Sequence, residues 1–238
     1  DLGPVVDVAL GLDHQCVLRR NGRVLCKGKN DSGELGVSSD QLTRSAEFRL
    51  VPGVPAMKKI EVRRGQTCAS TEDGQLWCWG RDQLPARMDL PAPVRVWTMN
   101  DGFTNLSSCI VMEDNSVLAD GARLLAAPSE APIHDVTSNC CTVSGEEGLV
   151  HCPSEDGYSL VQTEEPISEL LADFNHRLTR TNRLLRSNAV LASDVVYAAA
   201  NRKTVCVVDG RGQLRCQGYL VALDTDRGGC GKSFMTGW

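Results

Sequence analysis

The chain has 238 residues, long enough for one large domain or two small ones; 42% of them are hydrophobic and only 5% aromatic. Twenty-five basic and thirty acidic residues give a net charge of −5, which argues against a nucleic-acid binder that needs a basic stripe. No apolar run approaches the ~18 residues of a membrane span, so we expect no span in this chain.

The first predicted element is a strand at Val5–Leu10, followed by a hairpin between Cys16 and Cys26. If these cysteines lie opposite each other, the three-residue loop 20–22 remains. Such a loop is typically a type I turn that ends in a left-handed residue, and Gly22 adopts that conformation without a Cβ penalty. Opposed antiparallel Cα atoms lie ~4.5–5.5 Å apart, within reach of a disulfide. The spacing therefore predicts a cross-hairpin disulfide.

Similar spacings recur in three further cysteine pairs, two of them ten residues apart and one eleven apart with the extra residue in its turn. Zinc-ligand pairs are usually two to four residues apart, which fits this spacing poorly. Reduced cysteines in a core are the alternative, but they have no reason to repeat at one spacing. The predicted disulfides are Cys16–Cys26, Cys68–Cys78, Cys141–Cys152 and Cys206–Cys216.

Three cysteines remain outside these pairs: Cys109, Cys140 and Cys230. At most two of them can pair within the chain. Cys109 has lost its hairpin partner, since Ala119 stands in the second cysteine position. We favour a Cys109–Cys140 link between neighbouring copies of the repeat, with Cys230 free or bonded to another chain.

Two further hairpins lack a cysteine pair. One covers residues 110–118 and follows Cys109; the other covers residues 178–185, with His176 and Arg186 at the cysteine positions. Asn115 and Asn182 replace glycine at the left-handed turn position, where Asn is the next most tolerant residue. A short strand is predicted before each of the six hairpins, at residues 5–10, 60–62, 94–98, 133–136, 167–171 and 195–199.

The six copies recur on average every 38 residues between Cys26 and Cys216. Proline-bearing stretches between them leave room for one outer strand, for example at residues 48–51 or 160–162. A four-stranded unit near forty residues, repeated radially, is a β-propeller blade. We therefore expect an all-β fold, a single propeller domain over residues 1–238. The sequence shows six four-stranded blades, and a total of seven blades stays an alternative. A linear β-solenoid is the alternative, but its coils usually lack a tight internal hairpin.

The first copy also carries a family resemblance. Residues 8–18 (VALGLDHQCVL) and 21–36 (NGRVLCKGKNDSGELG) resemble the repeat of regulator-of-chromosome-condensation propellers, roughly V-A-x-G-x-x-H-x-x-A-L and D-G-x-V-x-x-W-G-x-N-x-x-G-Q-L-G. Residues 73–80 (DGQLWCWG) match its second half, and the other copies are more degenerate. The resemblance implies a propeller, usually of seven blades, and a structural role for His14.

The cysteines place the chain outside the reducing compartments of the cell. The best-known member of this family is a nuclear nucleotide-exchange factor for a small GTPase, but hairpin disulfides persist in oxidising surroundings. The cysteine pattern is similar to ectodomains of crinkly-type plant receptor kinases and, more distantly, to a secreted bacterial inhibitor that caps β-lactamases. We therefore predict a secreted or extracellular protein. Sequons at Asn30 and Asn105 are weak glycosylation candidates.

No motif for catalysis emerges from the sequence. Residues 228–233 resemble a phosphate loop, but Asp226 stands where the motif requires glycine. A metal cluster around Cys141 and His151 competes with the predicted disulfide. We expect no enzyme activity, no metal and no cofactor.

Acidic residues recur near the starts of five predicted first strands. As turn or cap residues they would accept backbone hydrogen bonds, and a Ca²⁺-binding ring is the alternative. The five are Asp7, Glu61, Asp135, Glu169 and Asp194.

The leading functional hypothesis is a non-enzymatic protein-binding or scaffolding module, because rigid scaffolds carry function on their loops. The alternatives are a secreted inhibitor that caps an enzyme, an enzyme that uses the channel, and a small-GTPase exchange factor. Four of the loops that join a first strand to its hairpin contain Arg or Phe, the usual anchors of protein interfaces, although the Phe side chains could instead fill gaps between blades. The candidate binding residues are Arg63, Arg64, Phe103, Phe174, His176, Asn201, Arg202 and Lys203.

Overall fold

The structure is a computed structural model whose description covers most of the chain. It includes residues 3–11, 13–63, 65–99, 108–119, 123–125, 128, 130–137, 139–154, 157–171, 176–186, 189–200, 204–224 and 229–235. Within the strands, the side chains of residues 123–125, 176, 199–200, 204, 206, 214, 216–224 and 229–235 lie outside that description. The chain divides into two compact units, Asp1–Ala127 and Pro128–Trp238.

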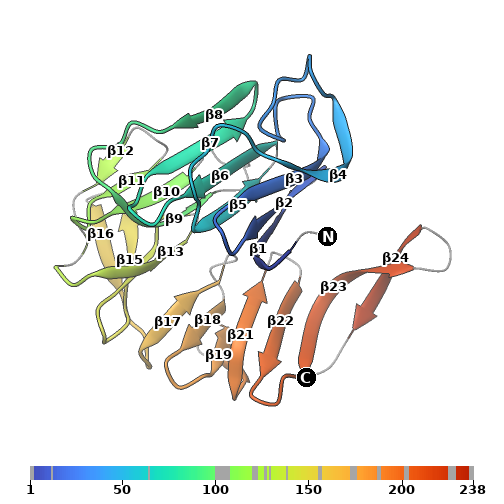
Figure 1. The fold of residues 1–238 in the computed structure, drawn as a ribbon. Coiled ribbons are helices and arrows are strands. Elements are labelled where there is room, and N and C mark those ends of the chain that lie inside the picture. The colour runs from blue at the N-terminus through green and yellow to red at the C-terminus, as the bar shows by residue number, and fades with distance from the viewer. Residues whose placement is uncertain are drawn as a thin grey trace. The chain divides into compact units, whose positions relative to one another are not determined.

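The first unit contains three antiparallel sheets of four strands, each in chain order (Figure 1). Sheet 1 is β1(Val5–Leu10), β2(His14–Arg19), β3(Val24–Lys29) and β4(Arg44–Leu50). Sheet 2 is β5(Lys59–Arg63), β6(Gln66–Ser70), β7(Leu76–Gly80) and β8(Gln83–Arg87). Sheet 3 is β9(Val94–Met99), β10(Ser108–Met112), β11(Val117–Ala119) and β12(Arg123–Leu125).

The second unit repeats this arrangement. Sheet 4 is β13(Ile133–Val136), β14(Thr142–Ser144), β15(Leu149–Ser154) and β16(Gly157–Val161). Sheet 5 is β17(Ile167–Leu170), β18(His176–Thr179), β19(Leu184–Arg186) and β20(Ala189–Ala192). Sheet 6 is β21(Val195–Ala200), β22(Thr204–Asp209), β23(Leu214–Asp224) and β24(Gly229–Met235).

Six four-stranded meanders in chain order are the repeating units of a β-propeller, so the predicted fold class is confirmed. The described residues form strands and no helix, and among them there is consequently no helix able to cross a membrane. The segment that resembled a phosphate loop is largely β24, paired with β23. The single domain over residues 1–238 remains a prediction.

The hairpins have the predicted register. Cys16 faces Cys26, and Cys109 faces Ala119. The last turn residue is left-handed in every copy: φ is 79° at Gly22 and 63° at Asn115, and the values at the other four positions, Gly74, Gly148, Asn182 and Gly212, range from 58° to 79°. In the first copy, Gly22 N donates to Arg19 O at 2.9 Å, which closes the turn.

Three of the four predicted disulfides are present: Cys16–Cys26, Cys68–Cys78 and Cys141–Cys152, each with its Cα atoms 4.1 Å apart. Cys206 lies opposite Cys216 in the backbone register, and the side chains of both, like that of Cys230, lie outside the described part. Cys109 and Cys140 are each disulfide-bonded as well, so neither is a free thiol. The link between these two remains a prediction.

Neighbouring sheets within a unit share an apolar core that is mostly aliphatic, although Trp79 and Trp97 are its largest fully buried side chains. Sheets 1 and 2 bury Leu18, Val24, Ile60 and Trp79 together with further apolar residues. Equivalent cores join sheets 2 and 3, sheets 4 and 5, and sheets 5 and 6. The alternating strand pattern turns one face of each participating strand toward these cores.

Carboxylates from the first strands link neighbouring sheets. Asp7 Oδ2 accepts a hydrogen bond from Ile60 N at 3.3 Å, and Asp135 Oδ2 accepts one from Leu170 N at 2.8 Å. Glu61 Oε2 accepts from Met99 N at 2.9 Å. For these three of the five acidic residues the prediction of a backbone acceptor is confirmed. Asp7 and Asp135 also accept locally, from Val8 N and Val136 N, each at 2.8 Å, but the three longer-range donors belong to the next sheet. Each carboxylate thus provides an acceptor for a main-chain N–H group at the edge of the neighbouring sheet, where that N–H has no strand beside it to pair with.

We predict that Glu61→Ala lowers the free energy of unfolding by about 2 kcal/mol, because it leaves Met99 N without its charged acceptor. Glu61→Gln keeps an acceptor oxygen and should cost less than half as much. Urea unfolding of both variants checks this. Equal losses for the two variants would show that the hydrogen bond is not what stabilises the pair of sheets.

Peptide mapping under non-reducing conditions should recover Cys206–Cys216 and Cys109–Cys140 besides the three disulfides already described. Cys206 and Cys216 lie opposite each other in a hairpin and are geometrically able to pair, and Cys109 and Cys140 are each disulfide-bonded without facing a cysteine in their own hairpin. Recovery of Cys109 or Cys140 linked to Cys230 instead would contradict the predicted pairing.

Candidate functional site

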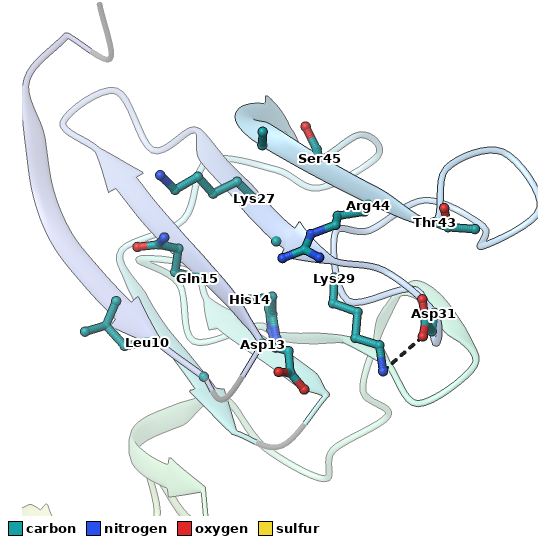
Figure 2. Close-up of a pocket in the computed structure, with 13 residues that line it drawn as sticks. Leu10, Asp13, His14, Gln15, Lys27, Lys29, Asp31, Thr43, Arg44 and Ser45 are labelled. Carbon is teal, nitrogen blue, oxygen red and sulfur yellow. Dashed lines mark ion pairs between the residues drawn. The ribbon is translucent and has the colours of Figure 1, made fainter. Parts of the chain in front are cut away.

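A polar groove of about 810 Å³ lies at one end of sheet 1. All four strands contribute to its lining, including Leu10 of β1, Gln15 of β2, Lys27 of β3 and Arg44 of β4. This is the end of the sheet at which β1 connects to β2 and β3 connects to β4, opposite the tight hairpin turn. In Figure 2, Lys27, Arg44 and Lys29 follow one another across the groove, with Asp31 beyond Lys29.

The base of the groove is built around His14, only 4% of which is exposed. Its Nε2 lies 2.9 Å from Thr67 Oγ1 in sheet 2. Burial lowers the pKa of His14, although the nearby carboxylates of Glu34 and Asp13 oppose that shift. The imidazole is therefore neutral near pH 7 and connects two sheets, in agreement with the structural role that the resemblance implied.

Asn30 organises the loop between β3 and β4, which forms one wall of the groove. Its side chain is fully buried: Nδ2 donates to Val37 O at 3.0 Å and to Leu42 O at 2.5 Å, and Oδ1 accepts from Leu35 N at 2.7 Å. A glycan on this nitrogen would break the loop, so the predicted glycosylation site at Asn30 is wrong. Asn105 lies outside the described residues.

The same loop is fixed to sheet 2 through Glu34, which replaces the Gln of the family pattern. Its main-chain oxygen accepts from Trp79 Nε1 at 3.1 Å, and its carboxylate accepts from Ser32 N at 2.8 Å. Asp82 N in turn donates to Ser32 O at 2.8 Å. These bonds hold the wall of the groove in place, because every partner belongs to a packed sheet or to a tight turn.

The charged side chains of the groove are unevenly paired. Lys29 Nζ lies 2.9 Å from Asp31 Oδ2, and the hydrogen bond and charge of Asp31 raise the pKa of Lys29. The Lys27 ammonium lies 4.7 Å from the centroid of the Phe48 ring, a cation–π distance. Among the ion pairs of the described residues, none includes Lys27 or Arg44. The groove can therefore offer two cationic groups to a ligand.

Only one of the predicted binding residues is described in full. Arg63 ends β5, is half-buried and donates from Nη1 to Val62 O at 3.1 Å. Arg63 directly precedes the turn between β5 and β6. A Cβ atom added at Gly65 in this turn would lie 3.5 Å from Glu34 Oε1 in the wall of the groove. Arg63 therefore lies on the same rim of the first unit as the groove. His176 is the first residue of β18, opposite Arg186, with its side chain outside the described part. The remaining candidates, Arg64, Phe103, Phe174, Asn201, Arg202 and Lys203, also lie outside it.

Sequence reasoning missed the groove itself. Its residues come from four strands, and Arg44 follows a long loop, so no local pattern joins Arg44 to Lys27. The one local pattern that points to the groove is the N-x-x-G-E-L-G segment at residues 30–36. This segment forms a wall of the groove, but it does not identify Lys27 and Arg44 as its cationic residues. In the described part of the chain, no group of three or more His, Cys, Asp or Glu is placed to hold a metal ion.

Comparison with known proteins places the first repeat in context. Residues 5–34 match the family model of the regulator of chromosome condensation (RCC1) repeat, which confirms the repeat type that the sequence suggested. Human E3 ubiquitin-protein ligase HERC2 is 35% identical over 80 residues, which is 32% of this chain. The match spans only 2% of the length of HERC2.

Solved propellers share the fold at low sequence identity. Prp20p from Saccharomyces cerevisiae has a TM-score of 0.68 at 11% identity, with 90% of this chain and 72% of Prp20p covered. The CRINKLY WD40 ectodomain of the Arabidopsis thaliana receptor kinase ACR4 has a TM-score of 0.64 at 16% identity, with 92% and 83% covered. These likenesses show the fold alone.

We predict that the free energy of unfolding falls as the pH decreases below about 6.5, partly because of His14. The folded-state pKa of His14 lies below the value of 6.5 in the unfolded chain, so below pH 6.5 the unfolded chain binds a proton that the folded chain does not. His14→Gln should therefore show a shallower loss of stability between about pH 7.5 and 5.5 in urea titrations.

Partial desolvation also lowers the pKa values of His134 and His151, and the charge of Arg180 adds to the shift at His134, so some slope should remain in the variant. Glu169 acts in the opposite direction, since burial and the charge of Asp135 raise its pKa. All three are unchanged in His14→Gln, so the difference between the two slopes isolates His14. Identical slopes would refute the assignment.

Proposed function

We propose that this chain is a non-enzymatic protein-binding module that works in an extracellular, oxidising environment. The observation that supports binding most directly is the charged groove at the rim of sheet 1, whose walls are fixed by buried hydrogen bonds while Lys27 and Arg44 stay available. A preorganised surface loses little conformational entropy on association, so such a rim suits recognition of another protein.

The disulfides support the extracellular part of the proposal. Three cross-hairpin disulfides are present, and such bonds are rare where glutathione and thioredoxin keep thiols reduced. The ACR4 domain, which shares the fold, is an ectodomain. Prp20p, which also shares it, is described with binding properties to Gsp1p and histones, so the fold serves protein recognition in at least one relative. For the compartment of this chain, its own disulfides are stronger evidence than the likeness to Prp20p.

The use of the polar residues supports a non-enzymatic role. His14 lines the groove, but burial keeps it neutral and Thr67 already occupies its Nε2. The carboxylates of Asp7, Glu61 and Asp135 accept main-chain hydrogen bonds between sheets. General acid–base catalysis needs a titratable group within reach of substrate and with a suitable pKa, and these groups already serve the fold.

The test is a binding measurement with variants in the loops that the sequence predicts to bind. Oxidised protein would first be crosslinked to its partner in extracellular fluid, and the purified partner would then be measured by biolayer interferometry. We expect Phe103→Ala, Phe174→Ala and Arg202→Ala each to weaken binding at least about fivefold, with melting temperatures close to wild type.

Arg211→Ala is the matched control, because Arg211 is exposed in the tight hairpin turn between β22 and β23, at the opposite end of its sheet. If the two Phe variants unfold the protein and Arg202→Ala binds like wild type, these loops are not the binding surface.

A further inference from the structure

A small cavity inside the first unit is lined by one of the hairpin disulfides. It has a volume of about 140 Å³ and lies between sheets 2 and 3, with Cys68, Cys78 and Met88 in its lining. Cys78 is half-buried, and its Sγ lies 3.6 Å from Met88 Sδ. A cavity of ~150 Å³ can hold a molecule as large as benzene. The cavity therefore has room for a thiol group that approaches the disulfide.

The other hairpin disulfide described in the first unit is enclosed. Cys16 and Cys26 are fully buried in the core that sheets 1 and 2 share. Both disulfides close a hairpin over ten residues with the Cα atoms 4.1 Å apart, so their surroundings are what distinguishes them. Thiol–disulfide exchange requires a thiolate to reach one of the two sulfur atoms. We expect this access at Cys78 and not at Cys16 or Cys26.

A cationic side chain belongs to the same cavity. Arg81 also lines it, and no ion pair in the described part of the chain includes Arg81. Its φ of 52° places it in the left-handed region, where turns between strands favour Gly, Asn or Asp. A cation near a cysteine favours the thiolate, and a disulfide breaks faster when its leaving thiolate is stabilised. Arg81 would therefore promote reduction of this disulfide.

The disulfide lies close to the bonds that hold the wall of the groove. Only two residue pairs separate Cys68–Cys78 from the ends of β6 and β7, and the first of them is Thr67–Trp79. Trp79 Nε1 donates to the main-chain oxygen of Glu34 in the wall. Strand ends open locally more easily than strand centres, and a covalent cross-link limits how far such opening can extend. Loss of the cross-link would let it reach the residues that anchor the wall.

We propose that Cys68–Cys78 is a redox switch for the groove. A dithiol protein reduces it while Cys16–Cys26 stays oxidised, and the reduced chain holds the groove wall less firmly. A thiolate of the reductant attacks Cys78 Sγ, the bond to Cys68 breaks, and Cys68 leaves as a thiolate. The second thiolate of the reductant then releases Cys78 from the mixed disulfide.

This exchange transfers two electrons. The reductant ends as a disulfide, and its two thiol protons end on Cys68 and Cys78. The link to the groove rests on the proposed function, whereas the reduction itself does not.

Timed reduction of the intact, oxidised chain tests the chemical step. Dithiothreitol is the probe, and isotopically light and heavy iodoacetamide mark thiols that are free before and after full reduction. Peptide mass spectrometry then gives the reduced fraction of each disulfide. We expect Cys68–Cys78 to open at least about tenfold faster than Cys16–Cys26. Equal rates would overturn the proposal.

A charge variant tests the role of the cation. Arg81→Gln should slow the reduction of Cys68–Cys78 about threefold, because the leaving thiolate loses its cationic neighbour. Arg87→Gln is the matched control, since it makes the same charge change at an exposed residue of β8 in the same sheet. Equal slowing in the control would mean that the rate follows only net charge, and the role given to Arg81 would be wrong.

Residue-resolved amide hydrogen exchange tests the effect on the wall. Asp82 N donates to Ser32 O at 2.8 Å and so reports on the attachment of the wall to sheet 2. We expect this amide to exchange at least about tenfold faster once Cys68–Cys78 is reduced. The Gly22 amide, in the hairpin turn at the other end of sheet 1, should be unchanged.

The double variant Cys68→Ala/Cys78→Ala provides the same test without a reductant, and its Asp82 amide should exchange as fast as that of the reduced chain. Unchanged exchange at Asp82 in both the reduced chain and the variant would refute the switch. Neither measurement includes a partner. A negative result therefore refutes this inference alone, while the variants in the predicted binding loops test the proposed function separately.

Discussion

The register of each hairpin depends on one residue in a left-handed conformation. Gly22, Gly74 and Asn115 have φ values of 79°, 79° and 63° at equivalent positions, and the turn they close decides which residues face each other across the two central strands. A slip by one residue would send every side chain of a strand to the other face of its sheet. The apolar cores and the cross-hairpin disulfides therefore both follow from the turn, and the disulfides then hold that register covalently.

A second constraint arises where one sheet meets the next. Apolar packing between sheets is non-directional, and it leaves the backbone N–H groups of the first strands in need of acceptors. The carboxylates of Asp7, Glu61 and Asp135 supply those acceptors, so neighbouring sheets are joined by directional bonds as well as by packing. Between sheets 1 and 2, the contacts of His14 and Glu34 add to this connection and also hold the groove.

Features decided by neighbouring residues in the sequence could be predicted, whereas those decided by distant residues could not. The turns, the cysteine pairing and the first strands depend on spacing and on local chemistry, and the sequence gives both. The Asn30 sequon was misleading because its burial depends on Val37 and Leu42, which the triplet 30–32 does not include. The acceptor role of Asp7 was expected, but its donor is 53 residues away, so only the fold could identify it.

The groove separates the residues that stabilise the fold from those that remain free to bind. His14, Asn30 and the main chain of Glu34 are buried and already bonded, so their substitution would change stability first. Lys27 and Arg44 extend from the same strands and the adjoining loop, but they lie at the surface and contribute little to the shared core. Surface substitutions away from caps, cavities and buried networks usually change stability by less than about 0.5 kcal/mol. A loss of binding caused by changes at these positions can therefore be attributed to the binding surface itself rather than to the fold.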